Sequence, residues 1–240
     1  MKTIIRANVG LKTADATNQT AACRTDFTRG ASTLTPSLIV VNFRDYPQQR
    51  GCDALLSYYH SAMGGRLCYA VYPGDAAPAL MTLDAKVKLA TPSGLKELTI
   101  EQLVPGDMMV DGRIQSHVVR FNEIMTEIVV PPPRAGFKAS FEKLRPRGVW
   151  DFAMASASLG LQLRDKTIED ARVVFGGIAG RPWRERSVEE FLKGKTLTTE
   201  LAAQAPSNAL GNAAPLKYNA TKIDMAKGLL ASGLTKLASV

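Results

Sequence analysis

The clearest pattern of apolar and polar positions lies in the middle of the chain. In AKVKLAT, residues 85–91, Val87 and Leu89 alternate with polar neighbours, which predicts a strand with one buried face. A Pro-Ser-Gly turn joins it to LKELTI at 95–100, so the two segments predict a β-hairpin. NEIMTEIVV at 122–130 predicts another strand, and the three prolines at 131–133 cannot continue a sheet.

The stretch before this hairpin combines glycines, a tight turn and small apolar residues. LCYAVY at 67–72 predicts a strand that ends at Pro73 and Gly74. Asp75 follows the turn, and we expect its carboxylate to cap a short helix over 76–84. Pro78 is tolerated there because the first turn of a helix has free N–H groups in any case.

The second half of the chain begins with strands. GFKASFEKL at 136–144 predicts a strand, and GVWDFAMAS at 148–156 predicts a helical turn or two. LGLQLR at 159–164 and IEDARVVFGGIAG at 168–180 predict two paired strands around the Asp-Lys-Thr turn. We interpret the glycines of FGGIAG as sites of close backbone packing.

Helices follow. SVEEFLKG at 187–194 predicts a helix with a capping box of Ser187 and Glu190 and a stop at Gly194. TTELAAQA at 198–205 predicts a second helix. The segment 222–238 predicts an amphipathic terminal helix with one apolar stripe. That stripe consists of Ile223, Ala226, Leu230, Leu234 and Leu237.

Composition narrows the functional class. The 240 residues carry a formal net charge of +8, but the basic residues are spread along the chain, and the densest cluster is KLRPRGVW at 143–150. We therefore expect no nucleic-acid binding, and a protein or cofactor-phosphate role for the charge instead. The chain shows no apolar run near the roughly 20 residues of a membrane span and no signal-peptide pattern at its start, so we expect no membrane partner and a cytoplasmic location.

The chemistry-bearing residues are few. Cys23, Cys52 and Cys68 form no Cys-x-x-Cys pair, so neither a zinc ribbon nor a thioredoxin site is expected. His60 and His117 have no metal-ligand spacing and no nucleophile beside them, which favours structural roles. P-loop and G-x-G-x-x-G motifs do not occur. We expect no catalytic residues and no metal ligands in this chain.

The glycine pair at 64–65 and the Pro-Gly-Asp turn at 73–75 are the remaining candidates for ligand contacts. Gly64 and Gly65 would let backbone N–H groups approach a pyrophosphate closely. Asp75, behind Gly74, can accept hydrogen bonds from sugar or ribityl hydroxyls. A purely structural role for both features is the alternative.

The order of the motifs from residue 58 onward resembles the FAD-binding medium subunit of molybdenum hydroxylases, the family of xanthine dehydrogenase, carbon monoxide dehydrogenase and aldehyde oxidoreductase. That family carries a histidine before a glycine pair, a Cys-aromatic strand, a Pro-Ser-Asp turn, a helix of small residues, and Leu-Asp-Ala before a strand. The counterparts here are His60, Gly64 and Gly65, CYAVY at 68–72, PGD at 73–75 and LDA at 83–85. The segments 141–161, 171–195 and 214–234 resemble the family's C-terminal domain in the same order.

The resemblance implies an α+β fold. The second lobe of a PCMH-type FAD-binding domain is expected at 58–133, and a CO-dehydrogenase-flavoprotein-like C-terminal domain, a small antiparallel sheet plus helices, at 134–240. Residues 1–57 are expected to be a poorly ordered remnant of the flavin domain and its iron–sulfur insertion, with one strand at 37–43. The family's first FAD lobe has no counterpart, so the sequence is similar to an N-terminally truncated subunit.

The aldehyde oxidoreductase branch that the chain most resembles carries a 4Fe–4S cluster on four cysteines of the insertion. Only Cys23 and Cys52 fall in that region here, so a complete cluster site is not expected. Gly74 stands where the family has serine, which removes one hydroxyl.

The resemblance also implies the function and its residues. FAD would receive electrons from iron–sulfur clusters and pass them to an outside acceptor. Gly64, Gly65, Gly74 and Asp75 would line the cofactor, and Lys143 would place a cation near the flavin ring. The partners would be a molybdopterin-binding large subunit and a 2Fe–2S small subunit; a periplasmic location would require export with a partner. The alternative is a non-catalytic subunit that no longer binds FAD and serves as an assembly surface.

Overall fold

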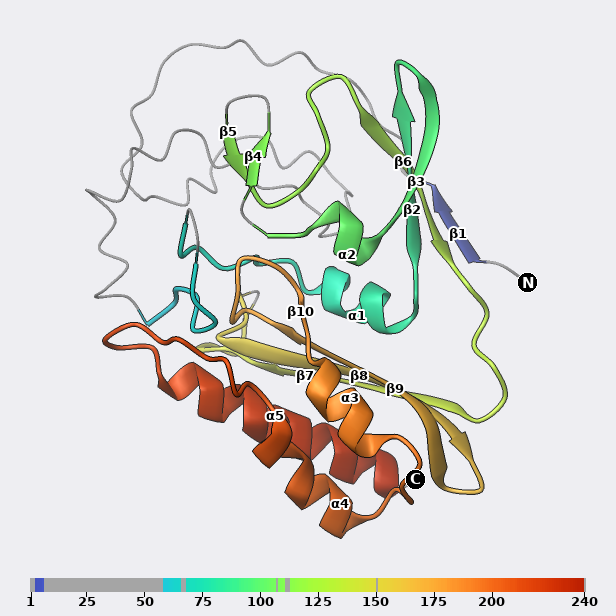
Figure 1. The fold of residues 1–240 in the computed structure, drawn as a ribbon, viewed down its shortest axis with the longest axis vertical. Helices are drawn as coiled ribbons and strands as arrows, with labels where there is room; N and C mark the ends of the chain where they lie inside the picture. Colours follow the sequence, from blue (N-terminus) through green and yellow to red (C-terminus); the bar gives the residue numbers. More distant parts are fainter. Residues whose placement is uncertain are drawn as a thin grey trace.

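The computed structural model describes residues 3–6, 58–65, 68–106, 108–110, 113–149 and 151–239. The expected strand at 37–43 and the side chains of Cys23 and Cys52 lie outside these residues. The described part has the α+β fold that the sequence predicts, with antiparallel sheets and helices (Figure 1). None of its helices combines the length and the apolarity that a membrane crossing requires.

The N-terminal sheet has the strand order β1-β6-β2-β3. β2 (Lys86–Thr91) and β3 (Gly94–Thr99) form the predicted hairpin, and β6 (Ile124–Val130) pairs with β2 on its other side. Val87 and Leu89 are fully buried, as their alternation predicts. β1 (Thr3–Arg6) pairs with β6 and lies in a region where the sequence predicts no strand.

Two smaller elements follow β3. Thr99 caps the short helix α2 (Ile100–Leu103). Its hydroxyl accepts from the backbone N–H of Gln102, and the Gln102 side chain accepts from the backbone N–H of Thr99. β4 (Met108–Val110) and β5 (Arg113–Gln115) then form a separate two-stranded hairpin.

The C-terminal sheet has the strand order β10-β9-β8-β7. Its members are β7 (Phe137–Leu144), β8 (Ala155–Arg164), β9 (Thr167–Gly176) and β10 (Trp183–Arg184). The paired strands around the Asp-Lys-Thr turn are confirmed as β8 and β9. The helical turn predicted over 148–156 is wrong, because 148–149 and 151–156, the described residues of this segment, form no helix and β8 already begins at Ala155.

That Ala155 and Ser156 belong to a strand and not to the predicted helical turn has a physical reason. The C-terminal sheet is covered on both faces, by α1 (Ala76–Thr82) on one and by α5 (Thr221–Ala238) on the other (Figure 1). The first seven residues of β8 are therefore all buried and lose the alternation that marks a half-exposed strand. Small residues that fit between two layers of helix give the same pattern as a short helix.

The other helices are α3 (Arg186–Leu192), α4 (Thr199–Gln204) and a 3-10 turn (Ala205–Asn208). The predicted capping box is wrong: α3 begins one residue before Ser187, whose hydroxyl bonds Glu185 and the Asn208 carbonyl. Gly194 follows the end of α3 with φ +79°, which confirms the predicted stop. In α5 the predicted apolar stripe is confirmed, with four members buried and Ile223 partly buried against the same core.

Candidate functional site

The ion pair between Asp75 and Lys143 joins two of the predicted site residues. The Oδ2 atom of Asp75 lies 2.5 Å from Nζ of Lys143 on β7. Asp75 precedes α1, but its carboxylate makes no capping hydrogen bond, so the predicted side-chain cap is wrong. The Lys143 side chain is 19% exposed and that of Asp75 37%, so both side chains are partly exposed.

The two-residue period of β7 explains why Lys143 faces α1. Its neighbour Glu142 points to the opposite face, where both of its carboxylate oxygens lie 2.7 Å from Nζ of Lys236 on α5. Lys143 pairs across the sheet with Ser156, on the face that α1 covers. A cation from the C-terminal sheet thus meets an anion at the start of α1.

The glycine pair forms a turn that closes on the chain itself. Gly64 has φ +76°, which other residues adopt only with strain. A Cβ on Gly65 would lie 2.3 Å from the carbonyl oxygen of Cys68, so that position admits no side chain unless the backbone moves. The space that Gly65 leaves is filled by this carbonyl, and Gly74 is buried directly before Asp75.

The segment 68–72 is not the strand that the sequence predicts. Its backbone bonds go elsewhere: the N–H of Ala70 donates to the Cys68 sulfur at 3.2 Å, and that of Tyr72 to the Ala179 carbonyl at 2.8 Å. The backbone of this aromatic, apolar segment therefore bonds to a loop and to its own side chains instead of to a neighbouring strand. Burial of Tyr72 raises the pKa of its hydroxyl to about 12.

The loop after β9 bonds to both segments that carry predicted site residues, the one before the glycine pair and the one before Asp75. The carbonyl of Ile178 accepts from the backbone N–H of Ala62 at 2.9 Å and of Met63 at 3.2 Å. The next carbonyl, of Ala179, accepts from Tyr72. A Cβ on Gly176 would lie 2.4 Å from the Ser156 hydroxyl. The close packing predicted for FGGIAG is confirmed.

Two side chains near the start of α5 hold the loop 59–61, and neither belongs to a recognised sequence motif. Lys222 donates to the carbonyls of Tyr59 and His60, and Asn219 donates to those of His60 and Ser61. Lys222 is fully buried, and burial lowers its pKa to about 7. The available signal was its position four residues before Ala226, on the apolar stripe of the helix.

His117 has a structural role, as predicted, and His60 is held through its backbone. His60 accepts bonds from Asn219 and Lys222 through its carbonyl, and burial followed by the charge of Lys222 lowers its pKa. His117 is buried, its Nδ1 accepts from the backbone N–H of Val119, and burial lowers its pKa to about 4. The lowered pKa values keep both imidazoles neutral at pH 7.

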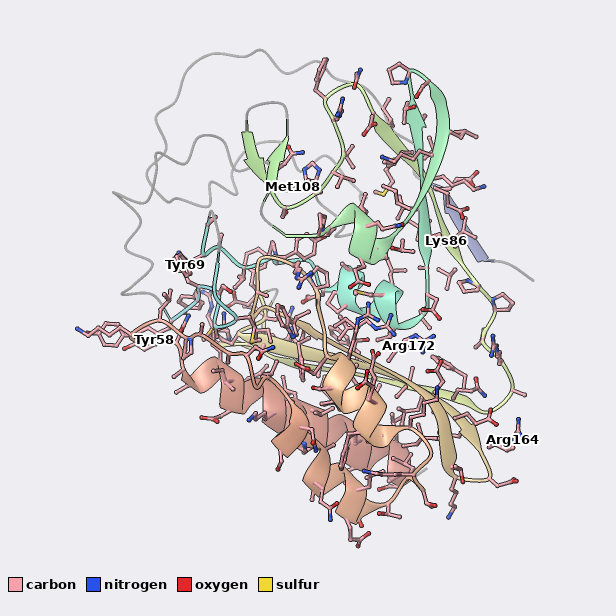
Figure 2. The ribbon with its side chains drawn as sticks, in the orientation of Figure 1. Tyr58, Tyr69, Lys86, Met108, Arg164 and Arg172 are labelled. Atoms are coloured by element: carbon pink, nitrogen blue, oxygen red, sulfur yellow. The ribbon has the colours of Figure 1, made fainter. Side chains whose placement is uncertain are left out.

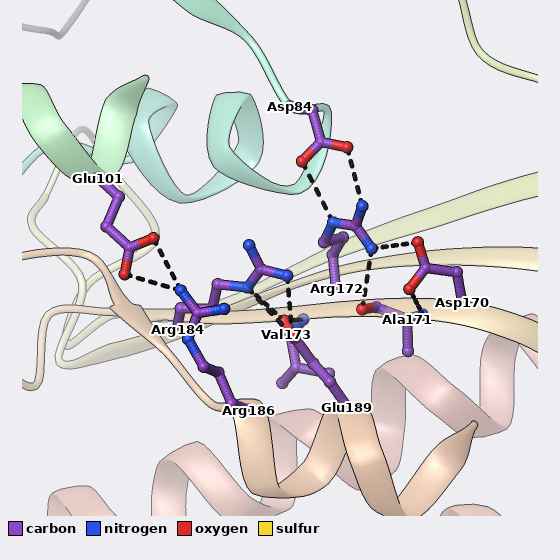
Figure 3. Close-up of polar contacts among 9 residues, drawn as sticks. All are labelled: Asp84, Glu101, Asp170, Ala171, Arg172, Val173, Arg184, Arg186 and Glu189. Carbon is purple, nitrogen blue, oxygen red and sulfur yellow. Dashed lines mark hydrogen bonds and ion pairs between the residues drawn. The ribbon is translucent and has the colours of Figure 1, made fainter. Parts of the chain in front are cut away.

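A row of polar contacts, here called the seam, joins the α1–α2 region to the C-terminal sheet and α3. Its members are Thr82 with Ser158 and two ion pairs drawn in Figure 3, Asp84 with Arg172 and Glu101 with Arg186. On the sheet side, the neighbouring Asp170 also accepts from Arg172. These contacts fix α1, and therefore Asp75, relative to the strand that carries Lys143.

The remaining basic and aromatic residues near the site have local partners. Arg147 pairs with Asp151 at 2.9 Å, and Arg145 donates to the Val149 carbonyl. Trp183 donates to Glu185 and lies under the Arg181 guanidinium. These contacts are local salt bridges, hydrogen bonds and packing contacts.

Two family models match the chain. Residues 59–133 match the FAD binding domain in molybdopterin dehydrogenase, and residues 139–236 match the CO dehydrogenase flavoprotein C-terminal domain. The two matches follow one another along the chain and together include Asp75 and Lys143.

Curated relatives and solved structures agree with these matches. The aldehyde oxidoreductase FAD-binding subunit PaoB of Escherichia coli is 31% identical over 193 residues, 78% of this chain and 56% of that protein. The glyceraldehyde dehydrogenase medium chain of Sulfolobus acidocaldarius is 28% identical over 60% of this chain and 48% of that protein. Carbon monoxide dehydrogenase of Hydrogenophaga pseudoflava superposes with a TM-score of 0.59 at 26% identity, over 69% of this chain and 59% of that chain. The chain spans about half the length of the curated relatives it matches.

Proposed function

Because the chain belongs to the family of FAD-binding medium subunits of molybdenum hydroxylases, we propose that it holds FAD as the electron-transferring part of such an enzyme. FAD, when bound, would supply the redox chemistry by carrying electrons from iron–sulfur clusters to an external acceptor. The polypeptide would bind and orient the cofactor and would do no chemistry on the substrate. Its partners would be a molybdopterin-binding large subunit and a 2Fe–2S small subunit.

The observation that carries this proposal is the partly exposed Asp75–Lys143 pair. Its donor and acceptor set fits FAD: a carboxylate accepts from ribityl hydroxyls, and an ammonium donates to the carbonyl oxygens and nitrogens of a flavin ring. Both side chains remain partly exposed, so a ligand can share their hydrogen bonds without displacing a buried group. The fit therefore rests on the chemistry of the two groups and on their exposure.

Each residue would have a separate part in holding the cofactor. Lys143 would place positive charge beside the ring and favour negative charge on it. Asp75 would hold the ammonium in place and accept from a hydroxyl. Gly74 adds no side chain beside Asp75, and the Gly64–Gly65 turn would present backbone next to the flavin.

FAD titration of the full chain tests this function. We expect saturable quenching of flavin fluorescence by the wild-type chain. Lys143→Met and Asp75→Asn should each weaken binding about 10- to 100-fold, since a hydrogen bond to a charged group contributes about 1.5–3 kcal/mol. Lys86→Met is the matched control, because Lys86 forms a similar but more exposed pair with Glu97 on the β2–β3 hairpin.

The outcomes separate FAD binding from the non-catalytic alternative. Quenching that both site variants weaken and the control does not would support the FAD-binding role of these residues. Binding that is unchanged in both variants would remove Asp75 and Lys143 from the site. A chain that ignores FAD, alone and when purified with its partner subunits, would support the non-catalytic alternative, which the FAD-binding relatives do not favour.

A further inference from the structure

We propose that Asn219 and Lys222, near the start of α5, are positioning residues that set the shape of the 59–65 loop and thereby the affinity of the chain for FAD. The inference rests on the proposed function, because the loop carries the Gly64–Gly65 turn that would lie beside the flavin. It adds a role for a helix whose residues lie more than 150 positions from the loop in sequence.

The first observation is the arrangement of donors. Nζ of Lys222 lies 2.8 Å from the Tyr59 carbonyl and 3.2 Å from that of His60. Nδ2 of Asn219 lies 3.0 Å from the carbonyls of both His60 and Ser61. Three consecutive carbonyls of the loop thus accept from two side chains near one helix end.

The second observation links these carbonyls to the glycine turn. The hydroxyl of Ser61 lies 2.6 Å from the Gly64 carbonyl and 3.1 Å from that of Ile178. The Ala62 carbonyl accepts from the N–H of Ala214, which precedes α5. The four hydrogen bonds from Asn219 and Lys222 to residues 59–61 are here called the clamp. A shift of residues 59–61 would therefore move Gly64 through Ser61 and Ala62.

Burial makes these hydrogen bonds energetically important. Lys222 and Asn219 are both fully buried, and a buried amine costs free energy unless it donates to good acceptors. An apolar side chain of the same length would fill this space without that cost. What the amine adds is its pair of bonds to the loop, so its effect is directed at the conformation of residues 59 and 60.

An aromatic contact at the surface also joins the loop to the segment before α5. The ring of Tyr58 lies 5.8 Å from that of Tyr218, centroid to centroid, next to Asn219 in sequence. Tyr58 projects at the end of the molecule where α5 begins (Figure 2). The loop therefore meets the start of α5 along both its backbone and its exposed aromatic side.

Two substitutions separate positioning from folding. Asn219→Asp keeps an oxygen for the Leu216 N–H, which Oδ1 of Asn219 accepts at 2.7 Å, but it replaces the donors to the loop with a carboxylate oxygen that repels the loop carbonyls. Lys222→Met keeps the length of the side chain and removes its donors. Lys236→Met is the matched control, since Lys236 lies on the same helix, is 62% exposed and bonds Glu142 instead of the loop.

The test measures the FAD dissociation constant, the visible spectrum of the bound flavin and the melting temperature of the ligand-free full chain. We expect Asn219→Asp and Lys222→Met to raise the dissociation constant about tenfold or more, the effect of losing one or two hydrogen bonds from the loop, and to alter the flavin spectrum. Lys236→Met should match the wild type. A purely structural role would lower the melting temperature and the fraction that binds, but would leave the constant and the spectrum of the binding fraction unchanged.

Wild-type binding with unchanged constants and spectra in both variants would overturn the positioning role and leave the proposed function intact. A wild-type chain that binds no FAD would overturn both. If Lys222→Met does not fold, Ser61→Ala decides, because it removes only the hydroxyl between the clamp and Gly64 and should weaken FAD binding in the same direction.

Discussion

Arg172 on β9 donates two parallel hydrogen bonds to Asp84. Nε donates to Oδ1 at 3.2 Å and Nη2 donates to Oδ2 at 3.0 Å, so the guanidinium and the carboxylate meet in the forked geometry that only arginine offers (Figure 3). Asp84 follows α1, and Asp75 precedes it. One end of α1 is thus fixed to β9 and the other to β7.

Replacing Arg172 tests the seam. Arg172→Lys keeps the charge but loses the fork, and we expect it to lower the free energy of unfolding by about 1 kcal/mol, a modest value because Asp84 is 57% exposed. Urea denaturation followed by circular dichroism measures this change. Arg164→Lys, in a pair where the arginine is 76% exposed, is the control and should leave stability unchanged. Equal effects of the two substitutions would contradict a structural role of the fork.

Gly65 provides a second prediction. Gly65→Ala would place Cβ against the Cys68 carbonyl, so the backbone must move, and we expect a loss of about 1–3 kcal/mol in stability together with weaker FAD binding. Gly228→Ala is the control: Gly228 lies exposed in α5 with nothing within 4 Å of the added Cβ, and it should raise stability by about 0.5–1 kcal/mol. Thermal unfolding and FAD titration of both variants check this contrast.

The predictable part of the fold is the part where one face is buried. Val87 and Leu89 alternate because β2 has a single buried face, and the α5 stripe repeats because one side of that helix packs on the sheet. At the start of β8 both faces are covered, and the period disappears. β1 is four residues long and gains its place only by pairing with β6, more than 100 residues later, which local pattern does not record.

The candidate site also has a part that the sequence predicts and a part that it does not. Asp75 and Lys143 were identified by resemblance to a family, and the structure then brings them together although they are 68 residues apart. Their pairing was not predicted, because the local environment of Asp75 favours a helix cap. Lys222 and Asn219 act on backbone carbonyls, which look the same in every sequence, so only the position of Lys222 on an apolar stripe indicated its burial.

Titration of Lys222 gives a third prediction. Its pKa is about 7 in the folded chain against 10.5 as the ordinary value, so between these pH values the unfolded chain binds the extra proton. The free energy of unfolding should therefore rise with pH from about 7 toward 10, by up to about 1.4 kcal/mol per pH unit. Denaturation of wild type and Lys222→Met at pH 7, 8 and 9 isolates the effect, since the variant lacks this slope. Parallel pH profiles would contradict a lowered pKa.

His117 gives the last prediction, with the slope in the acid range. Burial lowers its pKa to about 4 from an ordinary 6.5, and the neutral ring accepts the backbone N–H of Val119. Between pH 4 and 6.5 the unfolded chain binds the proton that the folded chain excludes, so the free energy of unfolding should fall as the pH falls through this range. His117→Gln removes this titration and should reduce the slope there to the part that His60 contributes, while lowering stability at pH 7. Equal acid sensitivity of the two chains would place the acid-labile group elsewhere. An NMR titration of the His117 ring, unchanged down to pH 5 in the folded chain, would assign it directly.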